Sequence, residues 1–136
     1  MIQRVQTLWM LLAALIVFLT LKFSFYNGTL AADNTYHAVI ASDSFLLLIL
    51  TSALGTGIVI TIFLFKNRTA QSRIMLLAII LECVIIFLYI KQTAKFSTGS
   101  FTLWSAFHLL IIILLFFAAR GVYKDSKLIR DSNRLR

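Results

Sequence analysis

The sequence predicts an all-α integral membrane protein, an up-down four-helix transmembrane bundle followed by a basic C-terminal tail. A helix needs roughly 20 mostly apolar residues to cross a bilayer. Four stretches come near that length: residues 5–25, 45–65, 74–90 and 103–119. Of the 136 residues, 60% are hydrophobic and 13% are charged. A soluble domain of this size could not hide so much apolar surface in one core.

The first stretch, 5–25, has a rival interpretation as a secretory signal peptide. A basic start at Arg4 precedes it, and the small pair Ala31 and Ala32 follows it. The apolar run is long for a signal peptide, and the small pair lies about ten residues past its end. We therefore expect this stretch to stay in the mature chain as the first span.

The connection 26–44 is the longest in the predicted bundle. It contains the turn signal Asn27-Gly28 and a short β-prone segment, 35–40, so a small hairpin could form there. Asp43 then supplies a residue of N-cap type just before the second span.

The second span, 45–65, contains a cluster of small residues. We expect Ser52, Ala53, Gly55, Thr56 and Gly57 to form a helix-packing face, because small residues four apart let helix backbones approach closely. Packing within the bundle is the simpler use of this face. A binding face for another protein is the alternative.

The third span holds Glu82 near its middle, and the fourth holds His108 near its outer end. An ionised carboxyl group alone in hydrocarbon is costly. Glu82 is therefore expected either to be protonated or hydrogen-bonded inside the bundle, or to form a proton or cation site. At 1.5 Å per residue, the predicted depths of Glu82 and His108 differ by at most about one helical turn. We expect the two to form an intramembrane polar pair.

No catalytic, cofactor-binding or metal-binding set is apparent in the sequence, so we do not expect an enzyme. A haem held by two histidines would need two imidazoles in the membrane, and the only other histidine, His37, lies in the outer connection. The lone cysteine, Cys83, permits no intramolecular disulfide.

Lysine and arginine are distributed unevenly between the two sides of the predicted bundle. Ten lie on one side, at Arg4, at Lys66, Arg68 and Arg73, and in the tail, whereas the other side has Lys22, Lys91 and Lys95. By the positive-inside rule, both termini are cytoplasmic. The loops 26–44 and 91–102 then face outward.

The tail, 120–136, follows the fourth span directly. We expect its basic residues to contact anionic lipid headgroups or a partner protein rather than nucleic acid. These residues are Arg120, Lys124, Lys127, Arg130, Arg134 and Arg136. An apolar stripe of Val122, Leu128, Ile129 and Leu135 favours an amphipathic helix on the headgroups. Asp125 and Asp131 are suited to pairing with basic residues within that helix.

Both ends of the chain resemble a known family. The start, Met1-Ile2-Gln3-Arg4-Val5-Gln6-Thr7, and the ending from Ala118 to Arg136 are similar to a Bacteroidota family of small four-span inner-membrane proteins described as a domain of unknown function. The resemblance implies residence in the cytoplasmic membrane of a diderm bacterium. It supplies no substrate and no catalytic residue.

Three functional hypotheses follow. The favoured one is a non-catalytic accessory or scaffolding subunit of a larger cytoplasmic-membrane complex, with protein export or secretion machinery one candidate. The alternative is a small proton-coupled transporter using Glu82, similar in size to four-span multidrug exporters, although those place their glutamate in the first span. A membrane enzyme is the least supported. The expected partners are larger integral membrane proteins and anionic lipid headgroups, with no nucleic acid and no small-molecule substrate.

Overall fold

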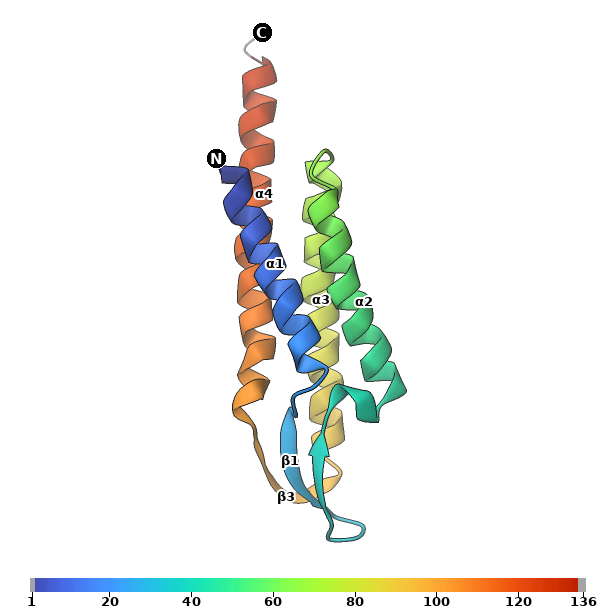
Figure 1. Cartoon of the computed structure of the whole chain (residues 1–136). Coiled ribbons are helices and arrows are strands. Elements are labelled where there is room, and N and C mark those ends of the chain that lie inside the picture. The colour runs from blue at the N-terminus through green and yellow to red at the C-terminus, as the bar shows by residue number, and fades with distance from the viewer. Residues whose placement is uncertain (1, 135–136) are drawn as a thin grey trace.

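The computed structural model describes residues 2–134, with side chains described for residues 5–128. Its helices are α1 (Ile2–Thr20), α2 (Phe45–Phe63), α3 (Arg68–Thr93) and α4 (Ala106–Arg134). Three strands occur: β1 (Tyr26–Leu30), β2 (Tyr36–Val39) and β3 (Phe96–Phe101). Short 3-10 turns, η1 (Ala41–Asp43) and η2 (Leu103–Ser105), precede α2 and α4. Figure 1 shows the order of these elements along the bundle.

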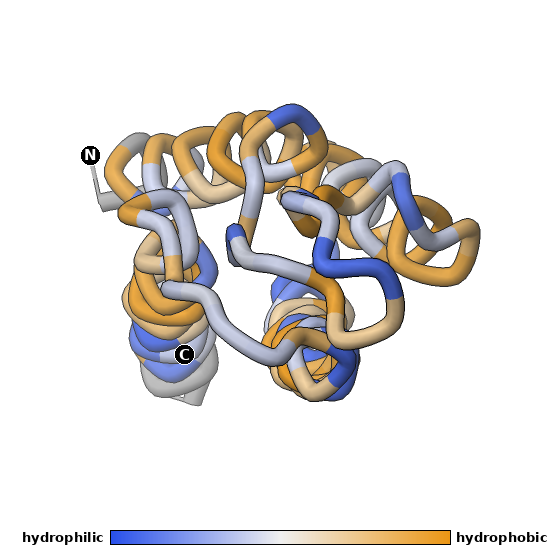
Figure 2. The backbone as a smooth tube through the Cα atoms, turned by 90° about the horizontal axis from the view of Figure 1, so that it is seen from below, coloured by the Kyte–Doolittle hydropathy of each residue, from blue (hydrophilic) through white to orange (hydrophobic). Residues whose placement is uncertain are grey.

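The four helices alternate in direction and form a bundle in which α1 packs on α2 and α4, and α3 packs on α2 and α4. Viewed along the bundle, they form two layers, α1 with α2 and α3 with α4 (Figure 2). Both chain ends lie at one end of the bundle, here called the termini end, and the strands lie at the other, here called the sheet end (Figure 1).

Three helical segments are long and apolar enough to cross a membrane: Phe45–Phe63, Arg68–Thr93 and Leu103–Leu128. The apolar segment Val5–Thr20 is shorter. The structure is therefore mostly helical and compatible with a helical membrane protein.

The first apolar stretch does not continue as helix to residue 25. The α1 helix ends at Thr20, whose hydroxyl donates to the Val17 carbonyl over 2.7 Å. The chain then turns, and the Phe25 amide donates to the Val39 carbonyl over 2.8 Å at the start of the sheet. The expected boundary was placed too late because apolar residues such as Phe23 and Phe25 serve the sheet end instead of the helix.

The all-α prediction is incomplete, because the structure also has a three-stranded antiparallel sheet with the order β2-β1-β3. The first two strands form a hairpin within the long connection, and β3 comes from the connection between α3 and α4. Gly28 lies opposite Gly99, and a Cβ on Gly28 would stand 2.4 Å from the Thr98 carbonyl oxygen. The β1 and β3 backbones therefore approach one another more closely here than a side chain would allow.

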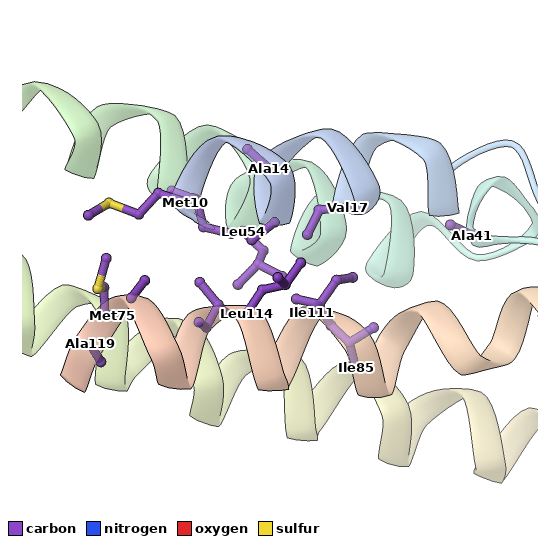
Figure 3. Close-up of a cluster of buried hydrophobic side chains, with 14 of the residues drawn as sticks. Met10, Ala14, Val17, Ala41, Leu54, Met75, Ile85, Ile111, Leu114 and Ala119 are labelled. Atoms are coloured by element: carbon purple, nitrogen blue, oxygen red, sulfur yellow. The ribbon is translucent and has the colours of Figure 1, made fainter. Parts of the chain in front are cut away.

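The core runs along the bundle axis between the two layers. Figure 3 shows Val17 of α1, Leu54 of α2, Ile85 of α3, and Ile111 and Leu114 of α4 directed into the space between the helices. Many other large apolar side chains point outward, as expected for a surface covered by lipid rather than water.

Candidate functional site

The centre of the candidate site is a polar pair that joins α3 to α4. His108, in the first turn of α4, lies with its Nδ1 atom 2.7 Å from Oε1 of Glu82, near the middle of α3. Glu82 is 1% exposed and His108 is 3% exposed. The structure thus brings together the two residues that the sequence singled out as an intramembrane pair.

Two aromatic rings cover this pair on the side of the sheet. Phe25 stacks on Tyr89 of α3 with ring centroids 4.5 Å apart, and it meets the His108 ring edge-on at 5.3 Å. The Tyr89 ring lies 5.1 Å from that of His108. The turn between α1 and β1 therefore supplies part of the wall around a pair formed by two other helices.

Chemically, the arrangement can hold one shared proton. The proton lies either on Nδ1, which then donates to the carboxylate, or on the carboxyl group, which then donates to the imidazole. Either form satisfies one oxygen of Glu82 and one nitrogen of His108 within the bundle. The cavities at the termini end and at the sheet end are lined by other residues.

The small residues of α2 divide between the inside and the outside of the bundle. Gly55 faces α1, and a Cβ at that position would stand 2.9 Å from the ring of Phe18. By contrast, a Cβ at Gly57 would meet nothing within 4 Å, and Ala53 and Thr56 are exposed. The hydroxyl groups of this helix donate to carbonyls of α2 itself, Ser52 to Leu48 and Ile49, and Thr56 to Ser52. One part of the predicted packing face thus meets α1, and the other part faces outward.

The predicted tail continues α4 without a break to Arg134. The side chains of Arg120, Lys124 and Lys127 are exposed. The side chains of Arg130 and Arg134, and the whole of Arg136, lie outside the described residues, as do those of Ile129, Asp131 and Leu135.

The start of the tail is attached to the bundle by an ion pair. Asp125 lies with Oδ2 3.1 Å from Nη1 of Arg68 at the start of α3, so the described partner of Asp125 is on another helix and not within its own. The expected apolar stripe also divides: Val122 is fully buried in the bundle, whereas Leu128 is 54% exposed. Figure 1 shows α4 rising past the other helices along the bundle axis instead of lying across it.

Sequence analysis missed a polar cluster at the termini end. Gln71 of α3 donates from Nε2 to the Thr61 carbonyl over 3.1 Å and makes a longer contact, 3.7 Å, with Sδ of Met10. Gln6 of α1 is 8% exposed, and its Nε2 has no hydrogen-bond partner among the described residues. The sequence signal for this cluster is the position of two glutamines close to apolar runs.

No group of three or more His, Cys, Asp or Glu residues that could hold a metal ion occurs in the described part of the chain.

Comparison with known proteins gives one result. No curated protein and no solved structure matches the chain. A family model described as "Domain of unknown function (DUF4293)" matches residues 2–135. Because this match extends over nearly the whole sequence, the chain belongs to the DUF4293 family.

Proposed function

We propose that this protein is a non-catalytic accessory or scaffolding subunit of a larger complex in a bacterial cytoplasmic membrane. The observation that carries the proposal is the shape of α4, which has 29 residues and continues past the other helices (Figure 1). At 1.5 Å per residue it is about 43 Å long, well beyond the roughly 30 Å of a hydrocarbon core. The helix therefore has about two turns available for contacts outside the hydrocarbon core.

The side chains on this projecting part favour a protein partner. Tyr123 is 66% exposed and Leu128 is 54% exposed, and each is next to one exposed lysine, Lys124 or Lys127. Anionic lipid headgroups would be sufficient binding partners for the lysines alone. Exposed tyrosine, in contrast to lysine, is a residue type that is enriched at protein interfaces.

The orientation rests on charge. Four spans with both termini in the cytoplasm put ten of the 13 lysines and arginines on the cytoplasmic side. The projecting part of α4 then reaches into the cytoplasm, and the sheet lies on the opposite side of the membrane. The resemblance to inner-membrane proteins of the Bacteroidota supports the same compartment.

Site-specific photocrosslinking at native expression level tests this proposal. A photoreactive amino acid at Tyr123 should give one discrete crosslinked product with a larger integral membrane protein, identified by mass spectrometry. The matched control position is Phe45, which is 79% exposed at the sheet end. Lys124→Glu with Lys127→Glu should abolish the product, whereas Lys91→Glu with Lys95→Glu should retain it.

Crosslinking only to lipid or to a second copy of the chain, together with unchanged protein level after removal of residues 126–136, would reject the accessory role. The alternative is then a small proton-coupled transporter using Glu82, which the buried Glu82 and His108 pair favours. That alternative requires Glu82→Gln to abolish a proton-coupled flux in vesicles at a normal protein level.

A further inference from the structure

Two adjoining cavities lie at the sheet end, beside the last turn of α3. The larger one, of about 350 Å³, is lined by Lys91 and by three leucines, and the smaller one, of about 200 Å³, is lined by His37 and Asp43. Gln92 and Lys95 line both, so the two cavities share a wall. The larger cavity falls within the range of about 300–1,000 Å³ that is common for small-molecule sites.

The sheet end has few basic residues, yet two of them line the larger cavity. Of the 13 lysines and arginines, only Lys22, Lys91 and Lys95 lie near this end of the bundle. Lys91 and Lys95 are both exposed, and neither takes part in an ion pair within the described part of the chain. Lys91 places Nζ 5.3 Å from the centre of the Phe87 ring, a contact that does not neutralise its charge. A phosphate in the larger cavity would therefore meet two uncompensated ammonium groups.

The smaller cavity adds a negative charge to this arrangement. Asp43 lines it and accepts the Ile40 amide on Oδ2 over 2.9 Å. Asp43 and Lys95 line this cavity together, but the described side chains form no ion pair between them. A ligand that carries a positive group a short distance from a negative group would match both side chains at once.

The wall of the larger cavity is apolar on the side nearer to the middle of the bundle. Leu46 and Leu47 of α2 and Leu88 of α3 form this side. Leu46 is 54% exposed, so the cavity is continuous with the outer surface of the bundle. In a membrane-spanning bundle, the ends of the apolar helices lie where acyl chains meet lipid headgroups. A ligand that fits all three parts has a hydrocarbon portion, a phosphate and a positive group, in that order.

We propose that these two cavities bind one phospholipid with an ammonium headgroup, of the phosphatidylethanolamine class. Lys91 and Lys95 donate to the phosphate oxygens, and the ammonium group donates to Asp43. The acyl portion follows the three leucines toward the middle of the bundle. This site is at the opposite end of the bundle from the projecting part of α4, so it does not depend on a protein partner there.

The test uses the full chain, purified and delipidated in mild detergent, and four probes that separate the parts of the ligand. Phosphatidylethanolamine has all three parts, phosphatidylglycerol lacks the ammonium group, diacylglycerol also lacks the phosphate, and phosphoethanolamine lacks the chains. Native mass spectrometry and thermal unfolding should show phosphatidylethanolamine bound about tenfold or more tightly than each of the others. Equal binding of phosphatidylglycerol would remove the role of the ammonium group, and equal binding of diacylglycerol would remove that of the phosphate. Equal protection by phosphoethanolamine would identify a soluble ligand, and any of these three results overturns the proposal.

Variants then test the residues, all of which are exposed, so the lipid-free variants should unfold at the temperature of the unchanged protein. Lys91→Gln with Lys95→Gln should weaken phosphatidylethanolamine binding about tenfold or more. Asp43→Asn keeps an oxygen acceptor for the Ile40 amide and should abolish the preference for phosphatidylethanolamine over phosphatidylglycerol. Lys22→Gln, at the same end but outside both linings, is the matched control and should bind normally. Normal binding by the double lysine variant, or an unchanged lipid preference in Asp43→Asn, would overturn the assignment of this site.

Discussion

Replacing Glu82 by leucine should expose the energetic value of its contact with His108. The two side chains are 1% and 4% exposed, so water cannot replace the lost partner of the imidazole. Hydrogen bonds between helices in membranes contribute about 0.6 kcal/mol on average and up to about 1.7 kcal/mol. A buried polar group left without a partner costs about 1–3 kcal/mol. We therefore expect Glu82→Leu to lower the free energy of unfolding by about 1–3 kcal/mol.

A double-mutant cycle measures the pair itself. Glu82→Leu, His108→Leu and the double variant are unfolded in mixed micelles by titration with a denaturing detergent. Each single variant leaves one buried polar group alone, whereas the double variant leaves none. The double variant should therefore be more stable than the sum of the single effects predicts, with a coupling energy of about 1–2 kcal/mol.

Two controls separate the contact from other effects. Glu82→Gln retains an oxygen acceptor and should lower the free energy of unfolding by less than about 1 kcal/mol. Cys83→Ser changes the neighbouring exposed residue of α3 and should have little effect. Additive single effects, within about 0.3–0.5 kcal/mol, would show that the two side chains do not stabilise one another and would refute this account.

Three further predictions concern packing, the termini end and topology. Gly55→Leu should lower the free energy of unfolding by about 1–3 kcal/mol because its side chain would collide with α1. Gly57→Ala, whose added Cβ meets open space, should be neutral or stabilising by up to about 1 kcal/mol, and thermal unfolding compares the two variants. Arg68→Ala should leave Asp125 buried without its described partner and accelerate tryptic cleavage of the projecting part of α4, and the exchange Arg68→Asp with Asp125→Arg should slow cleavage again. Alkaline phosphatase inserted in the exposed turn 31–35 should be active, and the same enzyme fused after the last residue should be inactive; the opposite pattern would reverse the orientation.

The helices were predictable because each is a long apolar run bounded by polar residues. The length of the apolar run was enough to predict the start of α2, which begins at Phe45 as expected. The end of α1 was not predictable in this way, because Phe23 and Phe25 are as apolar as the helix before them. Their role is set by partners elsewhere in the chain, Trp104 for Phe23 and Tyr89 for Phe25.

Strand β3 was not predictable from its own sequence. Phe96–Phe101 has serine, threonine and glycine between two phenylalanines, and its last five residues are all exposed, so no alternation of apolar and polar residues is needed. Its pairing with β1 depends on backbone hydrogen bonds and on contacts such as that between the hydroxyls of Thr29 and Thr98, 2.6 Å apart. These contacts join positions far apart in sequence, which local pattern does not reveal.

The Glu82 and His108 pair was accessible to sequence reasoning because depth in a bilayer can be counted from the ends of apolar runs. The pairing of Arg68 with Asp125 was not, because both residues lie where apolar runs give way to polar sequence and Asp125 has lysines close to it in the sequence. Helix α4 remains straight through this region, which brings Asp125 beside α3 instead of beside its own lysines (Figure 1).

The two polar pairs have a joint consequence for the projecting part of α4. Both join α3 to α4, Glu82 with His108 toward the sheet end and Arg68 with Asp125 at the termini end. At 1.5 Å per residue, they lie about 21 Å apart along α3 and about 26 Å apart along α4. Sliding α4 by one helical turn, about 5.4 Å, would break both pairs at once. The polar contacts inside the bundle therefore set how far α4 extends beyond it, so that weakening either pair should alter the projecting helix even though no substituted residue lies on its exposed surface.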